Sequence, residues 1–302
     1  MGTPGTAPGA LRTASVVVVG VGLLSSALSN VLFGRGIGDV SCTYTVKYSP
    51  SSPAFWIWYP IYVLGLLAVA DQINANSTNG EYDDTASNFL YGFAWMAAAA
   101  WTPAFTRTNK IEVDNKIEVD SKEPSLNSTT KTGLTEKGSS TKEIPYPPTL
   151  ALAAVFLVLT AALSMSATIV SNAWSKTLPN GVRSFSAMAY ASLAGWTLIA
   201  SSLNVIIAYK ANDNVPDPPC DEEDEYPNTY NILSKIDPDY STPTPLVLSL
   251  LVAVVASLLP NPVLPIPVIW ALLWIQPSYW NYTAIVVLIA SFSVAVFRLV
   301  SS

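Results

Sequence analysis

The residues that stand out chemically in this sequence are aromatic rather than ionisable. Tryptophan, tyrosine and phenylalanine recur in its long apolar segments, whereas Asp71 and Arg298, each near the end of a segment, are almost the only charged side chains there. Aromatic rings bind large apolar molecules by burial and stacking. Acid–base catalysis and ion-coupled transport instead need titratable groups within the membrane. The pattern therefore favours binding or scaffolding over catalysis, and we expect no enzyme.

Metal and redox chemistry is also disfavoured. Histidine is absent, and cysteine occurs only at Cys42 and Cys220, so the usual ligands of haem, zinc, copper and iron–sulfur centres are missing. We therefore predict no metal site, no catalytic residue and no cofactor. The two cysteines lie in connecting loops on one predicted membrane face, where they form either a disulfide or two free thiols. The chain has no basic stripe, which argues against nucleic-acid binding.

The apolar segments have the length of membrane-spanning helices. Half of the 302 residues are hydrophobic and only 12% are charged, compared with about a quarter charged in soluble proteins. About 20 apolar residues span the bilayer as a helix. We predict an all-α, multi-pass integral membrane protein with eight helices, at Thr13–Phe33, Pro53–Ile73, Ser87–Phe105, Thr149–Ser171, Ser184–Tyr209, Pro245–Leu259, Pro262–Gln276 and Trp280–Val300.

The sixth and seventh of these segments are short and bounded by prolines, so a re-entrant hairpin is the alternative and would leave seven helices or fewer. Lys and Arg are more numerous on the side of the long linker, which predicts that both termini face away from the cytosol. Lipid is the expected environment. The predicted organisation is three helices in 1–105, a disordered polar linker in 106–146, two helices in 147–209, an acidic loop in 210–244 and the C-terminal helices in 245–302.

Both polar connections have the composition of solvated chain. The linker is rich in Ser, Thr, Lys and Glu and contains a tandem hexapeptide, Asn109–Asp114 followed by Asn115–Asp120, which is typical of an expanded spacer. The acidic loop carries the run Asp221–Glu225. That run lacks the ligand spacing and central glycine of an EF-hand, so a solvated segment is favoured over a calcium site.

The spacing of the aromatic residues places some of them on shared helix faces. Trp58 and Tyr62 are one turn apart, as are Trp196 and Ala200. Each pair forms either a packing surface or a pocket wall, and Gly195 leaves room for a neighbour or a ligand. Asn204, one turn further on, bonds either a partner helix or a ligand. Tryptophans near helix ends are assigned to the interfacial belt: Trp56, Trp101, Trp174 and Trp280.

These residues resemble the TspO/MBR family, the tryptophan-rich sensory proteins related to the translocator protein, and in particular its longer branch with extra C-terminal helices. The resemblance covers roughly Asn30–Phe105 and Val182–Val300. The family pattern of the second helix and the segment before it is matched by Asn30, Gly38, Ser41, Pro50, Phe55, Trp58 and Tyr62. That of its last core helix is matched by Trp196, Ala200 and Asn204, and Trp270–Ala271 is similar to a Trp–Ala pair in the added helices.

Two positions depart from the family pattern. The third helix keeps the family tryptophan at Trp95 but has Gly92 where the family usually has asparagine, and Ala189–Tyr190 stands in place of Pro–Tyr or Pro–Phe. These two departures bear on the identity of the ligand more than on the fold.

The resemblance implies a five-helix core followed by about three further helices. It also implies an aromatic-lined pocket for a bulky apolar ligand, of the tetrapyrrole (porphyrin) or sterol class, in a receptor or carrier. The alternative is a non-catalytic structural or assembly subunit of a membrane complex. Porphyrin degradation is implied by the resemblance alone, and a homo-oligomer is left open. The expected ligand-binding residues are Phe55, Trp58, Tyr62, Trp95, Trp196, Ala200 and Asn204.

Overall fold

The computed structural model describes residues 9–33, 37, 52–77, 85–113, 140–145, 147–171, 185–212 and 263–274, together with positions 285, 286, 289 and 293. Several sequence predictions lie outside these residues: the helix at 245–259, nearly all of that at 280–300, both cysteines, the acidic run, and Trp174 and Trp280. Gly38, Ser41 and Pro50 of the family pattern lie outside them as well.

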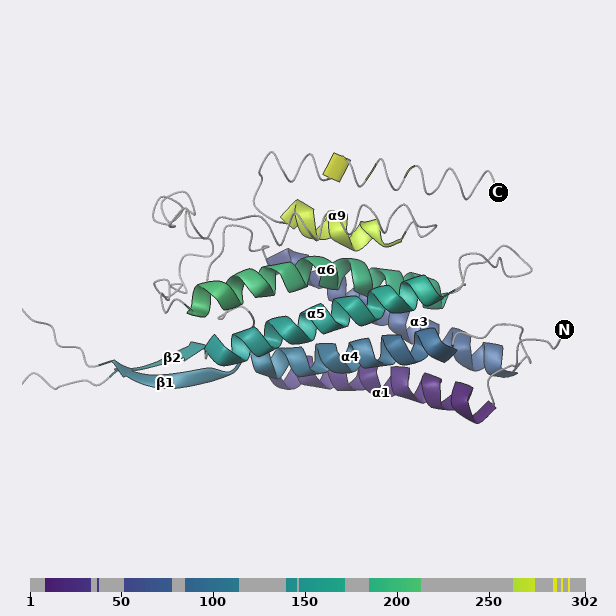
Figure 1. Ribbon diagram of the computed structural model, residues 1–302, viewed down its shortest axis with the longest axis horizontal. Helices are drawn as coiled ribbons and strands as arrows, with labels where there is room; N and C mark the ends of the chain where they lie inside the picture. Colours follow the sequence, from purple (N-terminus) through teal and green to yellow (C-terminus); the bar gives the residue numbers. More distant parts are fainter. Residues whose placement is uncertain are drawn as a thin grey trace, which may run out of the picture.

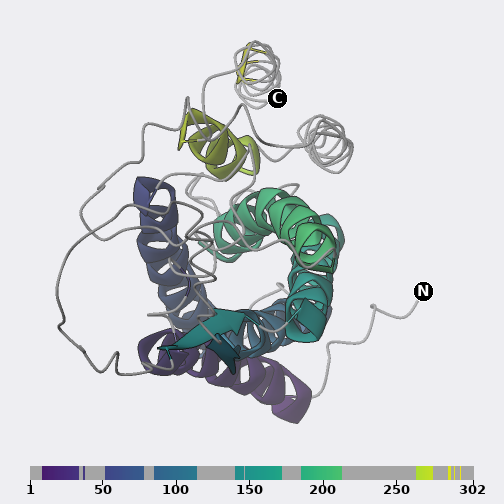
Figure 2. The same cartoon turned by 90° about the vertical axis from the view of Figure 1, so that its left-hand side faces the viewer.

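Five long helices form a closed bundle, as the sequence predicts. They are α1 (Gly9–Phe33), α3 (Trp58–Ser77), α4 (Thr85–Phe105), α5 (Pro147–Val170) and α6 (Phe185–Asn212). A short 3₁₀ helix, η1 (Ser52–Ile57), leads into α3. In the end-on view of Figure 2 the helices follow one another around the bundle in the order α3, α1, α4, α5, α6, and α3 and α6 pack together to close it.

Four of these segments are long and apolar enough to cross a membrane: Gly9–Phe33, Pro53–Asn74, Pro148–Val170 and Phe185–Tyr209. Helix α4 also has 21 residues, which is about 30 Å of helix and enough to span the hydrocarbon core. It is less apolar because it carries Asn88 and several Ser, Thr, Trp and Tyr residues, and neighbouring helices rather than lipid surround most of it. The chain is a multi-pass integral membrane protein.

Helices α1 and α4 approach one another through two glycines. A Cβ at Gly22 would lie 2.6 Å from the carbonyl oxygen of Gly92, and a Cβ at Gly92 would lie 2.9 Å from the backbone carbon of Val18. Small residues at a crossing let two membrane helices pack backbone to backbone. This contact explains why position 92 is glycine here, where the resembling family usually carries asparagine.

Buried polar side chains connect four helices near one end of the bundle. The amide nitrogen of Gln72 donates to the hydroxyls of Ser186, at 3.2 Å, and Tyr190, at 3.1 Å. The Tyr190 hydroxyl donates to the amide oxygen of Asn88, whose nitrogen donates to Ser15 at 3.4 Å. Polar groups within a membrane protein must find partners inside the protein, so this network fixes the register of α1, α3, α4 and α6.

The sequence predicts that the linker at 106–146 is disordered, but its two ends form β-strands. Strands β1 (Thr108–Val113) and β2 (Ser140–Pro145) pair antiparallel, with Thr108 opposite Pro145 and Val113 opposite Ser140. They extend beyond the bundle from the adjoining ends of α4 and α5 (Figure 1). Because α4 and α5 pack side by side, they bring the two segments into pairing distance, which local composition does not reveal. Residues 114–139 lie outside the described part.

One C-terminal helix packs on the outside of the bundle. This is α9 (Pro265–Trp274), within the segment predicted at Pro262–Gln276. It lies against α6 and η1. The indole nitrogen of Trp270 donates to the carbonyl oxygen of Ala54 in η1 at 2.9 Å. Gly195 of α6 faces the backbone of Leu264 so closely that a Cβ there would overlap with the Leu264 carbonyl oxygen. The space at Gly195 is therefore filled by a neighbouring segment.

Candidate functional site

Five aromatic side chains predicted to converge do so. Trp58 contacts Tyr62, Trp95 and Trp196, with ring centroids 6.0, 6.2 and 6.1 Å apart. Phe55 meets Trp196 edge to face at 6.1 Å, and Tyr62 lies 4.9 Å from Trp95. Offset and edge-to-face geometries are those that aromatic rings favour. The one-turn spacing on α3 and the matching faces of α4 and α6 thus build one continuous aromatic cluster.

Hydrogen bonds fix the position of Tyr62 within this cluster. Its hydroxyl bonds the Ser26 hydroxyl and accepts a hydrogen bond from the Asn30 amide nitrogen, both at 2.8 Å. The Asn30 amide oxygen in turn accepts from the Thr102 hydroxyl at 3.2 Å. Tyr62 is therefore tied to α1 and, through Asn30, to α4. Its ring is held against Trp95, which is fully buried.

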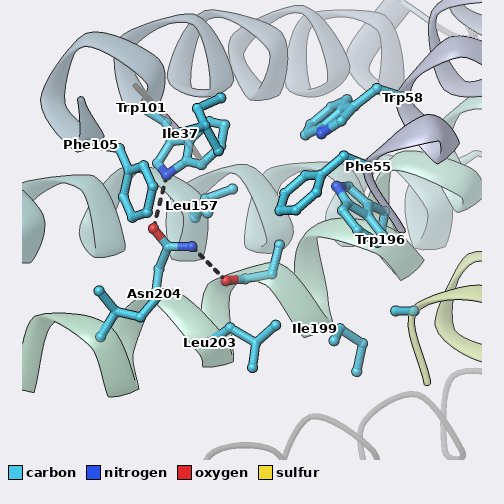
Figure 3. Close-up of a pocket in the computed structure, with 13 residues that line it drawn as sticks. Ile37, Phe55, Trp58, Trp101, Phe105, Leu157, Trp196, Ile199, Leu203 and Asn204 are labelled. Carbon is cyan, nitrogen blue, oxygen red and sulfur yellow. Dashed lines mark hydrogen bonds between the residues drawn. The ribbon is translucent and has the colours of Figure 1, made fainter. Parts of the chain in front are cut away.

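A pocket lies beside the cluster, and Figure 3 shows its lining. The space between the lining side chains measures about 590 Å³, a figure that includes the part open to the outside. Phe55, Trp58 and Trp196 gather on one side of the view, and Trp101, Phe105 and Asn204 on the other. The remaining lining residues are apolar: Ile37, Leu157, Ile199, Ala200, Leu203, Ile207 and Ala271.

A hydrogen bond between α4 and α6 crosses one end of the pocket. The indole nitrogen of Trp101 donates to the amide oxygen of Asn204 at 2.9 Å, and the Asn204 nitrogen donates to the Ala200 carbonyl oxygen at 2.9 Å (Figure 3). The sequence left two roles open for Asn204, a hydrogen bond to a neighbouring helix or one to a ligand. The structure shows the first of these, the bond to Trp101. The assignment of Trp101 to the interfacial belt is wrong, because this residue is only 5% exposed and faces α6. Trp56, by contrast, is 66% exposed.

The predicted site residues fall into two groups. Phe55, Trp58, Trp196, Ala200 and Asn204 line the pocket, whereas Tyr62 and Trp95 are not among its lining residues and pack against Trp58.

Three pocket-lining residues were not predicted from the sequence: Trp101, Phe105 and Ala271. Trp101 and Phe105 are one turn apart on α4, and their rings lie 5.4 Å apart. This spacing is a signal that could have identified them. Ala271 carries no local signal, because only the packing of α9 brings it to the pocket.

One polar group at the pocket has no partner among the residues that the structure describes. The indole nitrogen of Trp196 is buried and makes no hydrogen bond, and the residue is 2% exposed. A buried donor without an acceptor costs free energy, about 1–3 kcal/mol in typical proteins. The described part of the lining otherwise offers apolar and aromatic surface and includes no titratable side chain. The arrangement can hold an apolar molecule that carries a hydrogen-bond acceptor.

The fold and the pocket define the class of protein: a helical integral membrane protein with an aromatic pocket inside a five-helix bundle. Residues 12–111, which hold η1, α3, α4 and most of α1 and β1, match the family model described as TSPO-like protein. The match covers about the first third of the chain and confirms the predicted resemblance to the TspO/MBR family over these residues. No curated protein and no solved structure was found to match the chain.

Proposed function

We propose that this protein is a membrane receptor or carrier for a bulky apolar ligand of the tetrapyrrole or sterol class, held in the pocket between η1, α3, α4 and α6. The observation that carries the proposal is the pocket lining, in which Phe55, Trp58 and Trp196 present aromatic surface. Large apolar ligands gain affinity from such surface by burial and stacking. The predicted residues Tyr62 and Trp95 support the ring of Trp58 from behind.

The unpartnered indole nitrogen of Trp196 supports the same proposal. A carbonyl, carboxylate or hydroxyl oxygen on the ligand would accept its hydrogen bond and remove the cost of leaving this donor unpaired. We propose that the protein binds without catalysis, and the described lining residues, which carry no side chain suited to proton transfer, support this role.

Replacing Trp196 with alanine should weaken ligand binding. One stacking contact contributes about 0.5–1.5 kcal/mol beyond burial, so the dissociation constant of a fluorescent porphyrin should rise roughly threefold to tenfold or more. Titration of wild type and Trp196→Ala in detergent or nanodiscs measures this change. A fluorescent sterol is titrated in parallel to distinguish the two ligand classes.

Trp56→Ala is the matched control, because Trp56 has the same side chain but is exposed on the outside of the bundle. Its affinity should equal that of wild type. Melting curves for each variant separate a binding defect from a folding defect. Lower thermal stability of Trp196→Ala with unaltered affinity would favour the alternative role, a structural subunit in which the aromatic residues only pack.

A further inference from the structure

Helix α9 reaches the pocket from outside the five-helix core. Ala271 is one of the pocket-lining residues, although its helix lies beyond α6 in the chain and packs on the outer face of the bundle. Ala271 is 1% exposed, and its neighbours Val268 and Leu272 are also buried. The side of α9 that faces the bundle is therefore buried in the protein interior, whereas Ile266 and Leu273 on the other side are exposed.

The contacts that hold α9 adjoin two aromatic residues of the pocket. The Trp270 indole nitrogen donates to the carbonyl oxygen of Ala54, the residue before Phe55. Gly195, the residue before Trp196, faces the Leu264 backbone at the start of α9. Phe55 and Trp196 contact each other edge to face. Helix α9 and the residue before it therefore contact the backbone next to Phe55 and next to Trp196.

We propose that α9 is a wall of the ligand pocket that separates it from the bilayer between η1 and α6, and that Ala271 limits the size of ligand accepted on that side. The inference rests on the proposed function for the identity of the ligand. The small side chain of Ala271 is the reason that space remains beside Trp196. A larger side chain at this position projects into the pocket, because the α9 backbone is fixed at Trp270 and Leu264.

The test of the size limit is Ala271→Phe. Its affinity for a fluorescent porphyrin should fall at least about tenfold, since the new ring occupies the volume that the ligand needs. The control is Leu273→Phe on the same helix, which adds the same ring at a position that is 59% exposed. That variant should bind as wild type does. Ala271→Leu serves as a milder variant if Ala271→Phe does not fold, and its affinity should fall by a smaller factor.

The test of the wall needs no ligand. Gly195→Val should push α9 away, because its Cβ would overlap with backbone rather than with a flexible side chain. In nanodiscs containing brominated lipid, which quenches tryptophans that it contacts, the tryptophan fluorescence of Gly195→Val should be quenched more strongly than that of wild type. Gly20→Val is the control, since a Cβ at Gly20 meets no atom within 4 Å. Its quenching should match that of wild type.

The two measurements fail in different ways. If wild type binds neither porphyrin nor sterol but Gly195→Val is more strongly quenched, the proposed function falls and the wall remains. If wild type binds and both Ala271 variants bind equally well, Ala271 does not limit ligand size and the inference is overturned. Quenching of Gly195→Val equal to that of Gly20→Val would also overturn it, because α9 would then shield nothing from lipid.

Discussion

Gly92→Val should strongly destabilise the packing of α1 against α4. The Cβ would lie 2.9 Å from the Val18 backbone carbon and 3.0 Å from its oxygen, so α1 and α4 would have to separate. Overpacking a close contact commonly costs about 1–3 kcal/mol. The cost should lie at the upper end here, because backbone cannot move aside as a side chain can. A melting curve in detergent measures the loss.

Gly20→Val provides the comparison for this prediction. It introduces the same side chain on α1, at a position with no atom within 4 Å of the added Cβ, and it should melt close to wild type. Equal melting temperatures for Gly92→Val and wild type would contradict the glycine contact between α1 and α4.

Ala200→Phe should abolish most ligand binding while the bundle remains folded. Ala200 lines the pocket between Trp196 and Asn204, and a phenyl ring there fills space without removing the carbonyl oxygen that accepts from Asn204. We expect the affinity for a fluorescent porphyrin to fall by more than about tenfold. Equilibrium titration checks this value.

Ala70→Phe is the control for that substitution, because Ala70 is exposed on α3. It should leave affinity unchanged. If Ala200→Phe melts as wild type does and binds porphyrin with wild-type affinity, the ligand binds elsewhere and the pocket assignment is wrong.

The helical core could be predicted closely from the sequence. The segments predicted at Pro53–Ile73 and Ser184–Tyr209 correspond to η1 with α3 and to α6, since membrane-length apolar runs have few alternative structures. The convergence of Trp58, Tyr62 and Trp196 was also predictable, because residues one turn apart share a helix face.

Other features depended on contacts between distant segments, which local sequence does not encode. Trp101 lies near the end of α4, where an interfacial position is the ordinary expectation. Its burial and its hydrogen bond to Asn204 show that it faces inward. The pairing of β1 with β2 follows from the side-by-side packing of α4 and α5. The contribution of Ala271 follows from the docking of α9, and a lone alanine gives no signal of that kind.

The central claim is that the ligand lies inside the bundle, and photolabelling tests it most directly. A photoreactive sterol or porphyrin is bound to wild type, irradiated and mapped by mass spectrometry. The label should appear on Phe55, on α6 around Trp196 and Ala200, and on α9 near Ala271, and excess unlabelled ligand should compete it away. Label confined to lipid-facing residues such as Trp56 and Tyr59, which are 66% and 74% exposed, and unaffected by competitor would contradict the account.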